Sequence, residues 1–248
     1  MLSLRRLRCR GGTMGNRQRV RDRGNALPRK GRRVLQVRSR RRKGVSETKF
    51  PNRVLRRFVE TLSSELGGEQ FNAMLALSKL PAEWAKPDAF LKTDPVESAR
   101  VYASLQAAMR TYFGRGARGV LIRVGQHLWN HLLEDAALGG RAQAALVKRL
   151  PLSARRKATL DLLAKFIGTD PADITVHTLD LDLLLADHAS PNADGQSASA
   201  PICYVTQGLI RESLLWATGI HYDVEETSCK ARGEEACEFT ITGGKEPQ

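Results

Sequence analysis

The sequence contains no long hydrophobic run. Of its 248 residues 42% are hydrophobic, yet no apolar stretch approaches the ~18–20 residues that a membrane-spanning helix needs. The opening stretch, MLSLRRLRCRGG, also lacks the apolar core of a secretory signal. We therefore expect no membrane span and a cytoplasmic location. A chain of this length can bury one sizeable core.

Acidic residues are almost missing from the beginning of the chain. The segment 1–44 holds 17 Lys/Arg and one acidic residue, Asp22, which gives it a net charge of +16 against +14 for the whole chain. The other 204 residues are therefore nearly neutral, at −2. Because this Arg-rich segment has few large apolar residues, we predict a disordered tail over 1–48. It could bind nucleic acid without sequence specificity by neutralising phosphates, or it could be a solvated tail.

Helical periodicity dominates the first part of the remaining chain. The residues DPVE at 94–97 are typical of a helix start, with Asp94 as N-cap and Pro95 in the first helical position. That helix is expected to run to about 113 and to bury Val101, Tyr102, Leu105, Met109 and Tyr112. Other helices are predicted at about 52–66, in a short segment ending at Pro81, and at about 119–135, 153–167 and 204–218.

Strand-like alternation begins later in the chain. It appears in ITVHTLDLDLLLAD, residues 174–187, and again in a closing hairpin over about 221–242. Helices followed by strands, without regular β-α repeats, predict an α+β fold. We expect N-terminal helices packed on a mainly antiparallel sheet that is closed by a C-terminal β-hairpin, with the basic tail in front.

Motifs for nucleotide or redox cofactors are scarce. Residues 114–119 read GRGARG, which matches G-x-G-x-x-G, but the preceding segment is a predicted helix rather than a strand. An inter-helix loop is the better interpretation. His127 and His131 lie four apart on one predicted helix, but the intervening residues lack the acidic residue of a metalloprotease motif. These absences favour a binding role over catalysis, and no catalytic residue is predicted.

Cysteines are few, and three of the four lie near the end of the chain. Tyr222 and Val224 should face the core, and the period of a strand then turns Glu226 inward too. On the partner strand, Cys237 shares the inward phase of Phe239 and Ile241. Strict alternation would point Cys229 outward, so we expect a bulge or turn before Lys230. A buried carboxylate is costly unless a cation or strong donors meet it.

Cys203, Glu226, Cys229 and Cys237 therefore offer three thiolates and a carboxylate. Such a set suits a four-coordinate zinc ion. In a reducing compartment, clustered cysteines mark a metal more often than a disulfide. Three small cysteines packed in the core would give the same pattern, so the residues alone leave both interpretations open.

The C-terminal region resembles the 4-vinyl-reductase (4VR) type domain. The likeness lies in LLWATG followed by VEETSCKARGEEACEFTI and extends over about 115–242. This family includes hydrocarbon-binding proteins, the sensor domains of phenol- and xylene-responsive transcription activators, and a protein linked to bacteriochlorophyll synthesis. Its fold is similar to the ligand-binding domain of nitric-oxide signalling proteins and to subunits of the TRAPP vesicle-tethering complex. The chain would then divide into a tail (1–48), a helical region (49–114) and a small-molecule-binding domain (115–248).

The resemblance also implies a site and a function. In the phenol-responsive sensors a structural zinc is held by Cys, Glu, Cys and Cys, which correspond here to Cys203, Glu226, Cys229 and Cys237. The implied function is binding or sensing of a small apolar or aromatic ligand, with output through a partner. Alternatives are an enzyme or assembly factor of tetrapyrrole metabolism, and a homodimeric interaction scaffold like the TRAPP subunits. Candidate pocket residues, each also typical of plain core, are Leu121, Val124, Leu128, Trp129, Tyr204 and Trp216.

Overall fold

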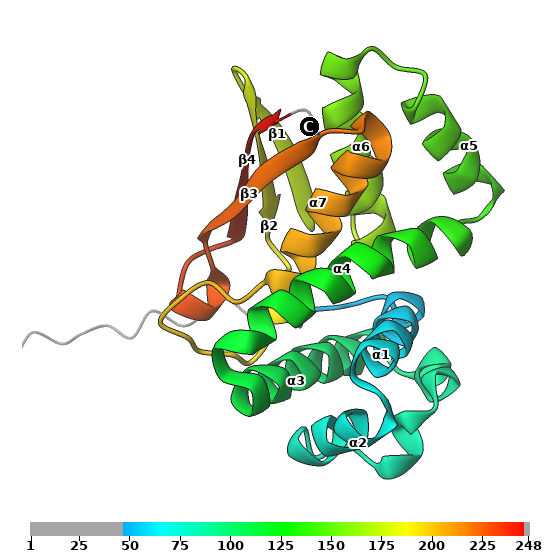
Figure 1. Cartoon of the computed structure of the whole chain (residues 1–248), viewed down its shortest axis with the longest axis vertical. Coiled ribbons are helices and arrows are strands. Elements are labelled where there is room, and N and C mark those ends of the chain that lie inside the picture. Colours follow the sequence, from blue (N-terminus) through cyan, green and yellow to red (C-terminus); the bar gives the residue numbers. More distant parts are fainter. Residues whose placement is uncertain (1–46, 246–248) are drawn as a thin grey trace, which may run out of the picture. The chain divides into compact units, whose positions relative to one another are not determined.

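The helices of this protein precede most of its sheet (Figure 1). The structure is a computed structural model that describes residues 47–245; the predicted basic tail lies almost wholly outside them. The predicted α+β class is confirmed. The helices are α1 (Asn52–Leu66), α2 (Gly68–Leu77), α3 (Pro95–Phe113), α4 (Ala117–Glu134), α5 (Leu138–Val147), α6 (Leu152–Ile167) and α7 (Tyr204–Thr218). The strands are β1 (Ile174–Leu179), β2 (Asp182–Asp187), β3 (His221–Ser228) and β4 (Cys237–Lys245).

The start of α3 confirms its predicted cap. Asp94 Oδ1 accepts a hydrogen bond from the backbone N–H of Val96 at 2.8 Å, and Pro95 occupies the first turn. The buried face was predicted correctly except at Tyr112, which is 53% exposed and packs edge-on against Phe113. Sequence analysis also missed α5. That helix has two glycines in its first turn and leaves Leu138 and Leu146 exposed, so it lacks the apolar stripe that indicates a helix.

The four strands form one antiparallel sheet in the order β1-β2-β4-β3. Helices α6 and α7 pack against it through contacts with β1 and β3. On its other side α7 contacts α4, and α4 in turn contacts α1. The first helices therefore reach the sheet region mainly through α4 and α7 (Figure 1). The division between 49–114 and 115–248 stays a prediction.

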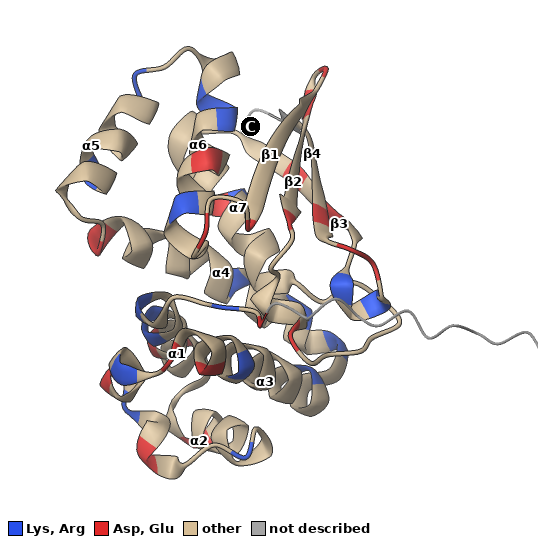
Figure 2. Cartoon of the chain, turned by 180° about the vertical axis from the view of Figure 1, so that it is seen from behind, with Lys and Arg blue, Asp and Glu red and all other residues tan. Residues whose placement is uncertain are grey.

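Charges of both signs share the same helices. Figure 2 shows basic and acidic residues together on α1, α3 and α6. The large positive charge of the chain lies in the first 44 residues, outside the described part. Within the described residues no helix is long and apolar enough to cross a membrane.

The contact between α4 and α7 depends on two glycines. A Cβ atom built on Gly125 would lie 2.1 Å from the carbonyl oxygen of Val205, and one built on Gly208 would lie 2.1 Å from that of Ile122. Each of these clashes is with backbone, which cannot swing aside as a side chain can. The two helices can therefore adopt this spacing only because neither residue carries a side chain.

This contact predicts the effect of a single added methyl group. We expect Gly125→Ala and Gly208→Ala each to lower the free energy of unfolding by at least about 2 kcal/mol, since overpacking against backbone forces the helices apart. Gly139→Ala is the matched control, because its Cβ would meet nothing within 4 Å. The control should stay within about 1 kcal/mol of wild type and on the stabilising side. Urea denaturation followed by circular dichroism measures all three, and equal stabilities would contradict the prediction.

Candidate metal centre and adjoining cavity

Four predicted ligands meet where α7 approaches the closing hairpin. Cys203 directly precedes α7, Glu226 lies near the end of β3, Cys229 follows that strand, and Cys237 opens β4. The three cysteines are fully buried. The predicted bulge is confirmed, because the β3–β4 register shifts between Glu226 and Ser228. This irregularity turns Cys229 back to the same side as Glu226.

The sulfur atoms have the spacing of metal ligands. Sγ of Cys203 lies 3.4 Å from Sγ of Cys237 and 4.0 Å from Sγ of Cys229, and the third pair is 3.8 Å apart. A tetrahedral zinc site with Zn–S bonds of about 2.3 Å places sulfurs about 3.8 Å apart. A disulfide requires about 2.05 Å, and all three cysteines are free. The four ligand atoms lie within 4.8 Å of one another, so this cluster could hold a metal ion.

Glu226 has a carboxylate oxygen that the protein leaves unsatisfied. Its Oε2 accepts a hydrogen bond from the backbone N–H of Cys203 at 2.8 Å, whereas its buried Oε1 has no partner among the described residues. Burial raises the pKa of this carboxyl to about 8. A buried oxygen without a donor is costly, and a cation at the centre of the cluster would remove that cost. Glu225, as predicted, is exposed.

The thiols also depend on a positive charge. Burial raises the pKa of Cys203, so this group resists ionisation on its own. Hydrogen bonds from Cys203 and Cys237 lower the pKa of Cys229. Without a cation, therefore, one sulfur is favoured as thiolate with its neighbours as thiols. A divalent ion would allow all of them to ionise, because thiolate rather than thiol is the metal ligand.

Ser190 supports the cluster and was missed by sequence analysis. Its Oγ lies 2.9 Å from Sγ of Cys237 and 3.7 Å from Sγ of Cys203. Its backbone N–H donates to Asp187 Oδ1 at 2.6 Å, and its φ of 41° is left-handed. The polar loop around Ser190 has no periodicity, so no pattern could mark this serine as a neighbour of the cysteines.

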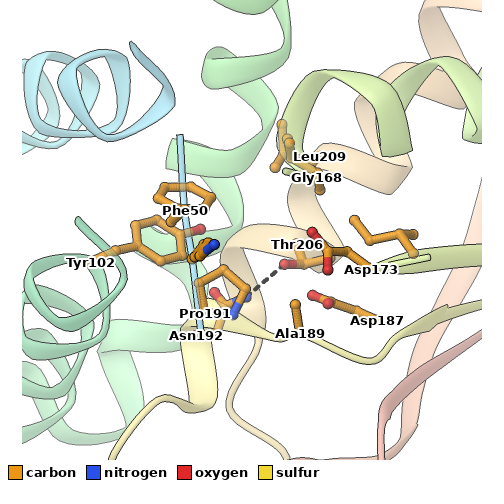
Figure 3. Close-up of a pocket in the computed structure, with 13 residues that line it drawn as sticks. Phe50, Tyr102, Gly168, Asp173, Asp187, Ala189, Pro191, Asn192, Thr206 and Leu209 are labelled. Atoms are coloured by element: carbon orange, nitrogen blue, oxygen red, sulfur yellow. Dashed lines mark hydrogen bonds between the residues drawn. The ribbon is translucent and has the colours of Figure 1, made fainter. Parts of the chain in front are cut away.

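A small cavity lies beside this loop (Figure 3). Its volume is about 10 Å³, which is room for roughly one water molecule. Ala189, Pro191 and Asn192, the neighbours of Ser190, line it. Phe50 and Tyr102 form another part of the wall, and Thr206 and Leu209 come from α7. The loop after β2 thus contacts both the cysteine cluster and the cavity.

The predicted pocket residues do not line this cavity. Four of them, Leu121, Val124, Leu128 and Trp129, are fully buried on α4. Trp216 packs edge-on against Trp129 with ring centroids 5.4 Å apart. Tyr204 lines an open groove with Arg118, whose guanidinium lies 5.9 Å from the tyrosine ring. The actual lining comes from segments far apart in the sequence, which no local pattern brings together. A ligand role for the six residues stays a prediction.

Comparison with protein families gives one match. Residues 188–242 match the 4-vinyl-reductase (4VR) domain, in agreement with the resemblance found in the sequence. This region contains all four candidate ligands. No curated protein matches the chain.

Solved structures show a related fold. An H-NOX protein from S. oneidensis in the Fe(II)NO ligation state aligns with a TM-score of 0.50 at 14% identity, covering 79% of this chain and 99% of that one. The phenol-responsive sensory domain of the transcription activator PoxR, solved with phenol, gives 0.40 at 18% identity, covering 56% and 73%. A trafficking protein particle complex subunit 3 from Naegleria fowleri, covalently bound to palmitic acid, gives 0.43 at 17% identity, covering 60% and 93%.

Two neighbouring glutamates provide a matched test of the metal centre. We expect protein purified without chelator to contain about one metal ion per chain, and Cys229→Ser to lose both the metal and thermal stability. Glu226→Gln should weaken metal binding by about tenfold or more, whereas Glu225→Gln should leave it unchanged because Glu225 is exposed. Elemental mass spectrometry and competition with a chromogenic chelator measure both. Metal-free wild-type protein together with a stable Cys229→Ser variant would rule the centre out.

Asp187 gives the folded state a pH dependence of predictable sign. Burial raises the pKa of its carboxyl from 3.8 to about 7. Between these values the folded chain holds a proton that the unfolded chain releases. The contribution of Asp187 to stability is therefore greatest below the unfolded pKa and is lost as the pH rises towards about 7.

We expect Asp187→Asn to remove this pH dependence. Relative to wild type, the variant should gain on the order of 3 kcal/mol in free energy of unfolding between about pH 5 and pH 8, at about 1.4 kcal/mol per pKa unit. Both proteins carry the same cysteine cluster, so its own titration cancels in the difference. Urea denaturation across this range measures the effect, and parallel pH profiles would contradict it.

Proposed function

We propose that this protein is a small-molecule-binding sensor module in which a structural zinc ion fixes one wall of the ligand cavity. The observation that carries the proposal is the double role of the loop after β2. Ser190 contacts the sulfurs of Cys237 and Cys203, while its neighbours Pro191 and Asn192 line the cavity. A change at either place must therefore pass through the same few residues.

Zinc suits the cluster better than other common ions. Three thiolates and one carboxylate form a soft donor set, and hard ions such as Mg²⁺ and Ca²⁺ prefer oxygen ligands. Four protein ligands would complete a tetrahedral shell and leave no position open for a substrate. The ion would therefore act structurally, by joining the start of α7 to β3 and β4.

The ligand in this proposal is a small apolar or aromatic molecule. The wall contributed by the N-terminal part of the chain includes the stacked rings of Phe50 and Tyr102, with centroids 4.3 Å apart. The domain match over 188–242 covers the metal centre and the lining residues that come from the loop after β2 and from α7. Residues 49–114 and 115–248 would thus act as two regions that close on one ligand. We further propose that the response passes to a partner, which includes a second copy of this chain.

A ligand screen with and without metal tests this function. Phenolic and other small apolar compounds should raise the melting temperature in proportion to the logarithm of their concentration, because they bind only the folded state. Removal of the metal by a chelator should weaken that binding, since the loop that lines the cavity loses its support. If no compound stabilises the protein, the interaction-scaffold alternative is favoured. If binding is equal with and without metal, the coupling through Ser190 is wrong.

A further inference from the structure

The polar atoms that face the cavity are mainly acceptors. Asn192 is 1% exposed and donates its amide nitrogen to Thr206 Oγ1 at 2.9 Å. Its buried Oδ1 has no hydrogen-bond partner among the described residues. Asp187 is 2% exposed and accepts from the backbone N–H of Ser190. Such a wall leaves buried capacity to accept hydrogen bonds, and a bound molecule with donors would use it.

The cavity is also negatively charged. Asp173 lines it, and its Oδ2 accepts hydrogen bonds from Thr169 N at 2.9 Å, Thr169 Oγ1 at 2.8 Å and Asp170 N at 2.8 Å. Burial opposes ionisation of Asp173, but these bonds outweigh it and lower the pKa. Its charge is close enough to Asp187 to raise the pKa of that carboxyl, in addition to the larger effect of burial. Two carboxyl groups thus share one wall.

No basic side chain of the described residues neutralises this pair through a salt bridge. Lys49 lines the cavity from an exposed position and favours the ionised form of Asp173. Lys230 also lies near Asp187, but its ammonium is bound to the carbonyl oxygens of His188 at 2.5 Å and Ala189 at 3.4 Å. The buried end of the cavity therefore keeps its negative character.

The opposite wall is aromatic. Figure 3 shows the rings of Phe50 and Tyr102 on one side of the cavity and Asp173 and Asp187 on the other. The two rings stack with an interplanar angle of 24°. Aromatic faces attract cations within about 6 Å of the ring centre. A positive group between these walls would meet carboxyl oxygens on one side and ring faces on the other.

We propose that this cavity selects a small primary amine, bound as its ammonium form with a short apolar or aromatic body. The proposal rests on the ligand-binding function proposed above and names the class of ligand. The ammonium group supplies the donors that Asn192 Oδ1 and Asp187 lack, and its charge complements the two carboxyl groups. The cavity holds only a methylammonium-sized group as it stands. A ring enters when Phe50, which precedes α1, rotates outward.

The experiment compares amines with neutral molecules of the same shape. Methylamine, benzylamine, benzyl alcohol and 4-methylphenol are titrated into the full-length metal-loaded protein, and binding is followed by melting temperature and by calorimetry. At pH 7 we expect the amines to bind at least about tenfold more tightly than the neutral compounds, because a charge-assisted hydrogen bond is formed in a buried site.

Two variants separate chemistry from general stability. Asp187→Asn should reduce benzylamine affinity by about tenfold or more and leave benzyl alcohol within about threefold of wild type. Asp180→Asn removes the same charge at the exposed tip of the β1–β2 hairpin and should change neither. Tighter binding of the neutral compounds, or an amine affinity that Asp187→Asn does not change, overturns the amine assignment while the ligand-binding function stands. Failure of all four compounds to bind overturns both.

Discussion

The close contact between α4 and α7 at Gly125 and Gly208 sets the geometry on which the rest depends. It fixes the position of α7, and α7 in turn carries Cys203 at its beginning and Thr206 and Leu209 on its cavity side. Because the contact is backbone to backbone, it cannot be adjusted by a change of rotamer. The metal centre and the cavity are therefore both referenced to one helix crossing.

The metal centre extends this constraint to the end of the chain. Cys203 belongs to the start of α7, whereas its partners come from the closing hairpin. The hydrogen bond between Cys203 N–H and Glu226 joins the two parts even without an ion. The edge strand β3 is held in a similar way, because Gln207 and Arg211 of α7 donate to the carbonyl oxygen of Val224. These side chains cover a carbonyl group that an open sheet edge would otherwise expose to other chains.

Sequence reasoning succeeded where a local rule applies and failed where tertiary contacts decide. The cap at Asp94, the inward phase of Glu226 and the bulge before Lys230 all follow from short-range geometry, and the structure contains each of them. The cavity could not be predicted, because Phe50, Tyr102 and Asp187 approach one another only after the helices and the sheet have packed. Tyr112 shares the periodicity of a buried face, but α3 ends at Phe113 and leaves it exposed. Periodicity indicates which face is apolar but not how far the neighbouring elements extend over it.

Ser190 combines two demands that ordinary substitutions separate. Its left-handed backbone, at φ 41°, favours glycine, which has no side chain to resist that conformation. Its hydroxyl, close to two cysteine sulfurs, requires a side chain that glycine does not have. Alanine would lose the hydroxyl and keep the strain, and threonine would keep the hydroxyl but add a branch that suits this backbone poorly. Evolutionary drift at this site is therefore expected to be narrow and to pass through asparagine or aspartate, which tolerate the left-handed region and retain a polar atom.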